Sequence, residues 1–294
     1  MGMDWVSLVA RRTRLGDSFL RRRVTLFALS CLAASLPLAS LAENRPDWVA
    51  ELRERSALDQ EVVEAVRENR LFILELCDVS SVCRDYGDIL RSAIGDAIDV
   101  KNLSQLADTA LVEIQEESAR GYLLWLGTPL GKKIAKLEAH MRQAERRRQM
   151  LAYKEEIQSL FETHPQRMWD LDALDEVRDG SAVRRRLNRI GVQVVEHILG
   201  RAAQADPANR ETPEDLEFRR QKAESAVRAE MRSVLAMEYA YLTDDEFKIF
   251  LQFVETSPAR EFNSARIDAY TSAVVHSARG IIELLDERLP AGPE

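Results

Sequence analysis

The chain has 294 residues, of which 41 are Lys or Arg and 49 are Asp or Glu, so its formal net charge is −8 at pH 7. This length is enough for one large domain or two small ones. The acidic excess repels phosphate groups, which argues against nucleic acid or an anionic lipid surface as a partner.

The N-terminus predicts a secretory signal at residues 1–42. Three arginines, 21–23, precede an apolar run at 24–41, and small residues, Ser40 and Ala42, occupy the two positions that a signal peptidase reads. We expect cleavage after Ala42 and a periplasmic location in a Gram-negative bacterium. The mature chain then keeps 35 of the basic and 47 of the acidic residues, a net charge of −12.

Three other interpretations of this segment were weighed. An uncleaved anchor is the main alternative, because the apolar run is about as long as the shortest membrane-spanning helices; Pro37 and the many small residues weaken it. A lipid anchor on Cys31 lacks the preceding leucine, and a twin-arginine signal lacks the usual Phe-Leu pair. The stretch before Arg21 is long, and is either an extended n-region or the product of too early a start codon. No membrane span is expected after cleavage.

Cys77 and Cys83 are the cysteines of the mature sequence, and a close, even pair in an oxidising compartment predicts a disulfide. Two buried free thiols are the alternative, and the spacing is not the Cys-x-x-Cys of redox-active pairs. Six residues of continuous helix rise about 9 Å, whereas a disulfide needs a Cα separation of roughly 4.4–6.8 Å. The bridge therefore requires a helix break, which the residues from Asp78 to Ser81 favour.

The mature sequence predicts an all-α fold, because helix-forming residues dominate and no stretch alternates with a period of two. Several helix starts are marked by a capping residue before proline, at Thr128, Thr212 and Ser257. Thr243 with Glu246 predicts a capping box, Ser56 another start and Ser181 a further cap. The predicted helices cover residues 57–76, 85–98, 104–126, 129–161, 165–178, 182–203, 213–241, 244–255 and 258–288.

Residues 205–210 predict a linker between an N-terminal half, 43–204, and a C-terminal half, 211–294. Each half contains an apolar stripe on one helix face, and the second stripe lies 128 positions after the first. The stripes are Ala119, Tyr122, Leu123 and Leu126, and Phe247, Phe250, Leu251 and Val254; Trp125 and Phe253 match as well. After a joint at Thr128-Pro129 or Ser257-Pro258, residues 135–139 match 265–269. We interpret the halves as related helical hairpins packed as an irregular bundle, with chance similarity as the alternative.

At these residues the sequence resembles a bacterial exported helical family, domain of unknown function 2059. The resemblance covers Leu242-Thr243 and its acids, the aromatic face and Ser257-Pro258 within residues 216–270, with a weaker first copy at about 104–140. Ala259 stands where a glycine is common in the family. The resemblance implies a secreted helical domain, and it brings no activity and no catalytic residues.

No catalytic, cofactor-binding or metal-ligating set is predicted. The four histidines, His140, His164, His197 and His276, lack metal-ligand spacing and are expected to be structural residues at or near the surface. The sequence contains no nucleophile elbow and no glycine-rich nucleotide loop.

Two patterns offer weaker functional interpretations. Four acids, Asp170, Asp172, Asp175 and Glu176, surround Trp169, which would suit a sugar-binding hydrolase; a half-solvated helix rim is the simpler interpretation. The aromatic stripes would suit a ligand groove, but packing between hairpins explains them adequately.

These observations lead to one main hypothesis and two alternatives. The main hypothesis is a periplasmic binding or interaction scaffold, with a groove between its halves for a protein or a small ligand of the cell envelope. The alternatives are a carboxylate-dependent cell-envelope hydrolase and a structural or assembly factor that acts as a homodimer.

Overall fold

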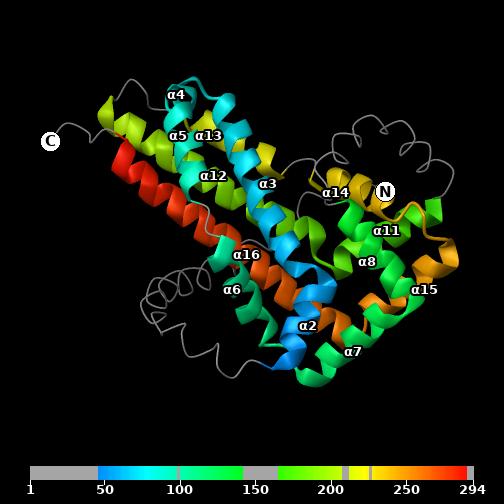
Figure 1. Ribbon diagram of the computed structural model, residues 1–294. Helices are drawn as coiled ribbons and strands as arrows, with labels where there is room; N and C mark the ends of the chain where they lie inside the picture. Colours follow the sequence, from blue (N-terminus) through cyan, green and yellow to red (C-terminus); the bar gives the residue numbers. More distant parts are fainter. Residues whose placement is uncertain (1–45, 98–99, 142–164, 207–211, 225–226, 290–294) are drawn as a thin grey trace, which may run out of the picture. The chain divides into compact units, whose positions relative to one another are not determined.

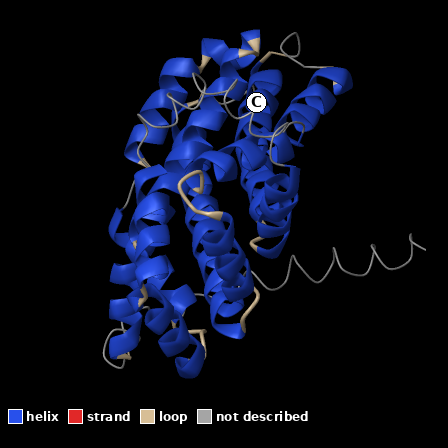
Figure 2. Ribbon diagram, turned by 90° about the vertical axis from the view of Figure 1, so that its right-hand side faces the viewer, coloured by secondary structure: helices blue, strands red, loops and turns tan. Residues whose placement is uncertain are grey.

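Three long helices, α3 (Leu58–Asp78), α12 (Gly180–Ala205) and α16 (Ser257–Arg288), pack against one another through much of their length (Figure 1). The computed structural model describes residues 46–97, 100–141, 165–206, 212–224 and 227–289. Within these ranges the regular structure is helical and contains no strand, so the predicted all-α class is confirmed (Figure 2). No described helix has both the length and the apolar character needed to cross a membrane.

The remaining helices are shorter and surround these three. They are α2 (Asp47–Ser56), α4 (Ser81–Asp85), α5 (Gly87–Asp96), α6 (Val100–Leu111), α7 (Glu116–Gly127), α8 (Pro129–Met141), α11 (Pro165–Val177), α13 (Pro213–Glu224), α14 (Val227–Glu238) and α15 (Asp244–Val254).

The buried side chains form three hydrophobic clusters. The central cluster joins α2, α3, α6, α7, α12 and α16 and contains Leu52, Val62, Leu111 and Ala273, among others. The disulfide-side cluster joins the far parts of α3, α12 and α16 to α4 and α5, with Ile73, Leu76, Leu90, Ile198 and Ile281 among its residues. The hairpin cluster joins α8, α11, α14 and α15 and includes Ile134, Leu171, Tyr239, Phe247 and Phe250.

The linker predicted at 205–210 falls largely outside the described residues. Helices that precede and follow it contribute to all three clusters. The region Pro46–Glu294 is accordingly one compact unit.

The joints of the two hairpins, α7–α8 and α15–α16, share one side-chain hydrogen bond, although Thr128 also accepts from the Gly131 amide and Thr256 makes no side-chain cap hydrogen bond. The Thr128 hydroxyl donates to the Trp125 carbonyl oxygen at 2.7 Å, and the Thr256 hydroxyl donates to the Phe253 carbonyl oxygen at 2.7 Å. The displacement is therefore 128 positions at the joint too, and Thr256 replaces Ser257 as the residue before the helix. The prolines of the two joints, Pro129 and Pro258, are 129 positions apart, because Pro129 directly follows its threonine and Pro258 comes one residue later.

Burial in the second helix of each hairpin follows the same register. Gly131 and Ile134 are buried in α8, and Ala259 and Phe262, 128 positions later, are buried in α16. The match of residues 135–139 with 265–269 has a displacement of 130 positions, not the 128 of the stripes. In this match the half-buried Ala135 and Ala139 correspond to the buried Ala265 and Ala269.

The aromatic side chains of the two stripes pack against each other. Ring centroids are 4.1 Å apart for Trp125 and Phe253, and 5.6 Å apart for Tyr122 and Phe253. Phe247 and Phe250 are 0% and 3% exposed. The interpretation of these stripes as packing surfaces between hairpins is confirmed.

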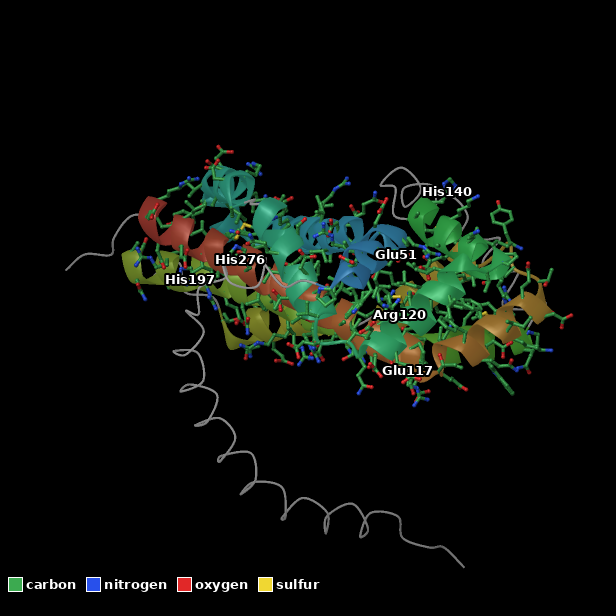
Figure 3. All side chains as sticks on the ribbon, turned by 60° about the horizontal axis from the view of Figure 1, so that its bottom comes forward. Glu51, Glu117, Arg120, His140, His197 and His276 are labelled. Carbon is green, nitrogen blue, oxygen red and sulfur yellow. A yellow bond between two sulfur atoms is a disulfide. The ribbon has the colours of Figure 1, made fainter. Side chains whose placement is uncertain are left out.

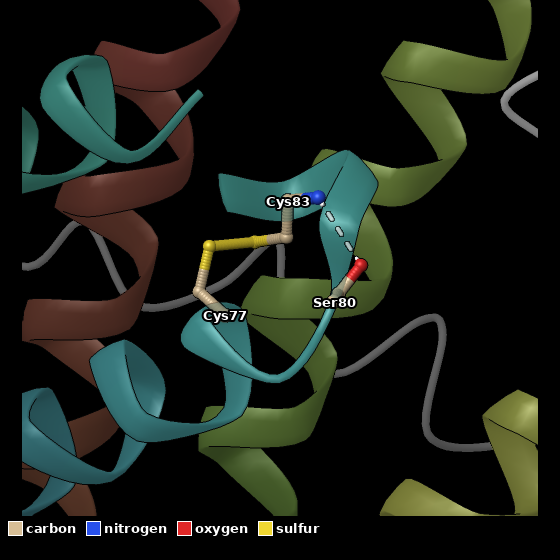
Figure 4. Close-up of a disulfide and its surroundings, with 3 residues drawn as sticks. All are labelled: Cys77, Ser80 and Cys83. Atoms are coloured by element: carbon tan, nitrogen blue, oxygen red, sulfur yellow. Dashed lines mark hydrogen bonds between the residues drawn. A yellow bond between two sulfur atoms is a disulfide. The ribbon is translucent and has the colours of Figure 1, made fainter. Parts of the chain in front are cut away.

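Cys77 and Cys83 form a disulfide across the predicted helix break (Figure 4). α3 ends at Asp78 and α4 begins at Ser81, which brings the two Cα atoms to 5.1 Å. The Ser80 hydroxyl accepts a hydrogen bond from the Cys83 amide at 3.1 Å and so caps α4.

Two predicted helix boundaries are wrong. Ser56 ends α2, which the sequence did not predict, and α3 follows after Ala57 in the left-handed conformation at φ 55°. The helix predicted at 104–126 is divided into α6 and α7, because Glu261 of α16 accepts hydrogen bonds from the Gln115 amide and the Ser118 hydroxyl at the start of α7.

Other predicted helices extend beyond what the structure describes. The part of the 129–161 helix beyond Met141 lies outside the described residues. The helix predicted at 213–241 corresponds to α13 and α14, with residues 225–226 between them outside the described range.

Candidate functional site

A cleft of about 490 Å³ lies between the central cluster and the hairpin cluster. Side chains from α3, α8, α11, α12, α14 and α16 line it, so residues from both sides of the predicted linker form its walls. Its volume lies within the range of about 300–1,000 Å³ that is usual for small-molecule sites.

The inner surface of the cleft is mostly apolar. Leu174, Leu187, Val227 and Leu235 are each less than 9% exposed. Further apolar side chains of the walls are Ala65, Met141, Val183, Met231, Val234 and Ile267. Such a surface suits the apolar body of a ligand, because burial there removes it from water at little cost in polar desolvation.

A hydrogen-bonded triad of Glu138, Arg178 and Tyr239 fixes one wall of the cleft. The Tyr239 hydroxyl donates to Glu138 Oε1 at 2.7 Å and accepts from the Arg178 guanidinium at 2.6 Å, while Arg178 also donates to Glu138 Oε1 at 2.9 Å. Burial raises the pKa of Tyr239 well above its usual value, Arg178 counteracts this, and Glu138 raises it further. Tyr239 is therefore a neutral donor that ties the C-terminal end of α14 to α8 and to the C-terminal end of α11.

A second polar group joins α3 to α16. The Tyr270 hydroxyl donates to Glu61 Oε2, and Arg266 lies 4.0 Å from the same oxygen. Arg266 also donates to Asn263 Oδ1 at 2.6 Å, and its Nε is buried with no protein hydrogen-bond partner. The Arg266 and Glu61 side chains are 12% and 9% exposed, so this group belongs to the inner wall.

Arg184 of α12 holds the other end of the cleft. It forms a hydrogen-bonded ion pair with Glu68 of α3 and lies 3.7 Å from Glu230 of α14. The Glu230 side chain is 57% exposed, whereas those of Glu68 and Arg184 are 17% and 23% exposed. Glu230 is therefore the most solvent-accessible member of this group.

Asp175 fixes the start of α12 beside the cleft. Its carboxylate accepts hydrogen bonds from both the amide and the hydroxyl of Ser181. A Cβ at Gly180 would lie 2.6 Å from Asp175 Oδ1, so the glycine allows this approach. The prediction that Ser181 caps the helix is wrong, because its hydroxyl is a donor to Asp175 and the cap is supplied from α11.

Acidic residues outnumber basic ones around the cleft. The acids are Glu61, Glu64, Glu68, Glu138, Asp175, Glu230 and Glu238, and the bases are Arg178, Arg184 and Arg266. The formal charge of these described lining residues is thus −4, and Glu64 among them pairs with Arg67, outside the lining, at 3.5 Å. Neither a lysine nor a histidine is among the described residues that line this cleft.

The described histidines are not gathered at one place. His140 on α8 lies well apart from His197 on α12 and His276 on α16 (Figure 3). His197 Nε2 is 2.9 Å from Asp286 Oδ1, His276 is exposed and His140 is half-buried, while His164 lies outside the described residues. Within the described part of the chain no group of His, Cys, Asp and Glu is arranged to hold a metal ion.

Trp169 and its neighbouring acids do not form a common site. The Trp169 side chain is 71% exposed and is not part of the cleft. Asp170 accepts from Gln166 at 2.9 Å, Asp172 pairs with Arg232 through two hydrogen bonds, and Asp175 caps α12.

The sequence reasoning missed the cleft residues, apart from Asp175. The paired groups lie far apart in the chain: 209 positions separate Glu61 from Tyr270, and 101 separate Glu138 from Tyr239. The one available signal was the presence of acidic residues and arginines at otherwise apolar helix positions, which a single sequence does not distinguish from a solvated face.

Comparison with protein-family models, with curated proteins and with solved structures finds no match to this chain. The resemblance of residues 216–270 to domain of unknown function 2059 therefore stays a prediction.

Proposed function

We propose that this chain is an exported binding protein that holds a small molecule in the cleft between its central and hairpin clusters. The observation that carries the proposal is the cleft itself, whose apolar inner surface has several ion-paired polar groups around it. Export rests on the sequence features of residues 1–42, and the periplasm is the proposed compartment.

The walls of the cleft suit binding because they are held in place before a ligand arrives. Glu138, Arg178 and Tyr239 join three helices, and Arg184 with Glu68 joins two more. A preformed site loses little conformational entropy when it binds, so more of the contact energy appears as affinity.

An uncharged fluorescent dye tests this proposal without knowledge of the natural ligand. N-phenyl-1-naphthylamine becomes brighter in an apolar site, and we expect saturable emission with one dye per mature protein. Ala65 is half-buried in the cleft wall, so Ala65→Trp should fill part of the cleft and weaken dye binding by about tenfold or more, the loss of one or two buried apolar contacts.

The matched control is Ala50→Trp on the exposed face of α2, away from the cleft. This variant should bind the dye as the parent does, and thermal unfolding followed by circular dichroism establishes that both variants are folded. Absence of saturable binding in the parent protein, or equal dye affinity of the two folded variants, would contradict the proposal.

A further inference from the structure

We propose that the surfaces through which the two hairpins meet are two copies of one self-complementary interaction surface, so that the partner each copy fits is a second copy of itself. The proposal concerns α7–α8 and α15–α16 and does not depend on whether the cleft binds a ligand. It rests on the juxtaposition of Trp125 with Phe253, which are 128 positions apart in the sequence and stack with ring centroids 4.1 Å apart.

The separation of 128 positions also holds for the starts of the helices. α7 begins at Glu116 and α15 at Asp244. α8 begins at Pro129 and α16 at Ser257, which is again a separation of 128 positions. Two residues at this separation therefore occupy equivalent positions of the two hairpins.

The aromatic contacts between the hairpins are reciprocal. Ring centroids are 5.6 Å apart for Tyr122 and Phe253, and 6.5 Å apart for Trp125 and Phe250. Phe250 is the equivalent of Tyr122. Because Phe253 is likewise the equivalent of Trp125, the second contact is the first with the two hairpins exchanged. Such reciprocity defines a twofold interface, in which one surface patch meets a copy of itself.

Two polar contacts between the hairpins are reciprocal as well. Lys133 of α8 donates to the carboxylate oxygens of Glu246 of α15 at 2.7 and 2.9 Å. Glu261 of α16 accepts from the Ser118 hydroxyl of α7 at 2.7 Å. Ser118 is the equivalent of Glu246, and Glu261 is the equivalent of Lys133, so the same two positions meet in both contacts.

The carboxylates of these two contacts satisfy equivalent backbone groups. Glu246 accepts a hydrogen bond from the Thr243 amide at 2.9 Å, and Glu261 accepts one from the Gln115 amide at 3.2 Å. Gln115 and Thr243 are the residues before α7 and α15, where a helix has amides without partners in its own backbone. The carboxylate comes from the same hairpin in one contact and from the opposite hairpin in the other, so the contact is kept although its side chains differ.

A small cavity between the hairpins lies where the twofold axis would pass. Its volume is about 30 Å³, and both members of several equivalent pairs line it. Leu126 occurs there with Val254, and Ile134 with Phe262. Residues next to a twofold axis lie close to their own equivalents, which is the arrangement seen around this cavity.

An exchange of the two central rings tests the proposal in the intact mature protein. Trp125→Phe leaves a gap and Phe253→Trp adds volume, so each substitution alone should lower the urea midpoint. The double variant Trp125→Phe/Phe253→Trp restores the same pair of rings with the hairpins exchanged. Its urea midpoint should lie closer to that of the parent than the midpoint of either single variant.

A double-mutant cycle tests the polar contacts. Ser118→Glu alone places a second carboxylate opposite Glu261, whereas Ser118→Glu/Glu261→Lys gives this contact the residue types of the Lys133–Glu246 pair. We expect the unfolding equilibrium constant of the double variant to be about two- to fivefold smaller than the two single variants together predict, as for a partly exposed ion pair.

Ser118→Glu/Glu283→Lys is the matched control, because it makes the same change of charge. Glu283 is exposed on the same helix as Glu261 and lies about 33 Å further along it, so no coupling is expected. Equal coupling in the two cycles, or a ring exchange that lowers the urea midpoint by the sum of its single effects, would overturn the proposal. Ser118 is buried, so the ring exchange decides the question if Ser118→Glu does not fold by circular dichroism.

Discussion

Buried polar side chains determine how the helices around the cleft are held. Arg167 illustrates this, because its guanidinium donates to the carbonyl oxygens of Tyr239 and Leu242 at 2.8 and 3.2 Å and lies 3.9 Å from the centroid of the Phe247 ring. Burial lowers its pKa, and Asp244 and Asp170 oppose that shift. A single residue of α11 thereby fixes the turn between α14 and α15.

At the same scale, Tyr239→Phe tests the triad of the cleft wall. The change removes the hydrogen bond that Tyr239 donates to Glu138 and the one that it accepts from Arg178, while Arg178 and Glu138 keep theirs, so we expect the free energy of unfolding to fall by about 1–2 kcal/mol in urea titrations. Tyr241→Phe is the matched control, since Tyr241 is 71% exposed and should change stability by less than about 0.5 kcal/mol. Equal effects of the two substitutions would show that the Tyr239 hydroxyl does not stabilise the wall.

Glu246 gives a pH-dependent prediction. The Lys133 ammonium donates to both of its carboxylate oxygens, at 2.7 and 2.9 Å, and this hydrogen bond, with that of the Thr243 amide, lowers the pKa of Glu246. Because the folded-state pKa is the lower one, the carboxylate stabilises the fold above its unfolded pKa of about 4.3 and ceases to do so as the pH falls through the folded value.

Glu246→Gln keeps a capping side chain at this position but removes the charge. The difference in urea midpoint between parent and variant should therefore be largest near neutral pH and shrink by about pH 3. Glu255→Gln, at an exposed position after α15, controls for the general effect of removing an acid. If the difference in urea midpoint were the same at about pH 3 as at neutral pH, the charge of Glu246 would not be what stabilises the fold.

At the scale of elements, the sequence predicted those helix ends that depend on neighbouring residues. Thr243 and Glu246 form the predicted capping box, the Thr212 hydroxyl accepts from the Asp215 amide at 3.2 Å, and α3 ends within the predicted break. Each of these signals involves side chains within a few positions of the backbone groups that they satisfy.

Ends that depend on distant residues were not predictable from local patterns. α7 begins at Glu116 because Glu261 accepts a hydrogen bond from the Gln115 amide. Glu261 lies 146 positions after Gln115, within the helix predicted at 258–288. α2 ends at Ser56 because Ala57 adopts a left-handed conformation, which is uncommon for alanine, while Trp48, Val49 and Leu52 secure α2 in the central cluster. Neither effect has a signature in the nearby sequence.

The joint between α7 and α8 gives an element-scale prediction. A Cβ added at Gly131 would lie 2.1 Å from the Trp125 carbonyl oxygen, so Gly131→Ala should displace the joint and lower the free energy of unfolding by about 1–3 kcal/mol. A Cβ added at Gly200, an exposed position of α12, meets nothing within 4 Å, so Gly200→Ala should stabilise the protein by about 0.4–1 kcal/mol. Urea titrations that gave the same sign for both would contradict the hairpin packing described here.

For the molecule as a whole, the sequence predicted the fold class, the disulfide and a binding hypothesis, but not the site. The cleft exists because two hydrophobic clusters meet around paired charges from six helices, an arrangement that depends on how those helices are packed. Helix periodicity identifies buried faces without saying which faces meet, so Glu138 and Tyr239 could not be paired in advance.

The proposed export gives a prediction for the entire chain. Intact-mass measurement of the protein recovered from a periplasmic fraction should give residues 43–294, with a mass about two daltons below that of the dithiol because of the Cys77–Cys83 bridge. A mass that includes residues 1–42 would exclude cleavage after Ala42. Reduction with dithiothreitol should restore the missing two hydrogens, and failure to do so would contradict the bridge.

The binding role of the cleft is tested most directly by a crystal structure of the mature protein grown with N-phenyl-1-naphthylamine. We expect electron density for the dye between Leu174 and Leu235 on one wall and Leu187 on the other, with the Glu138–Arg178–Tyr239 triad unchanged. Dye bound elsewhere on the surface, or a cleft filled by the protein's own side chains, would contradict the proposal that this chain holds a small molecule between its two clusters.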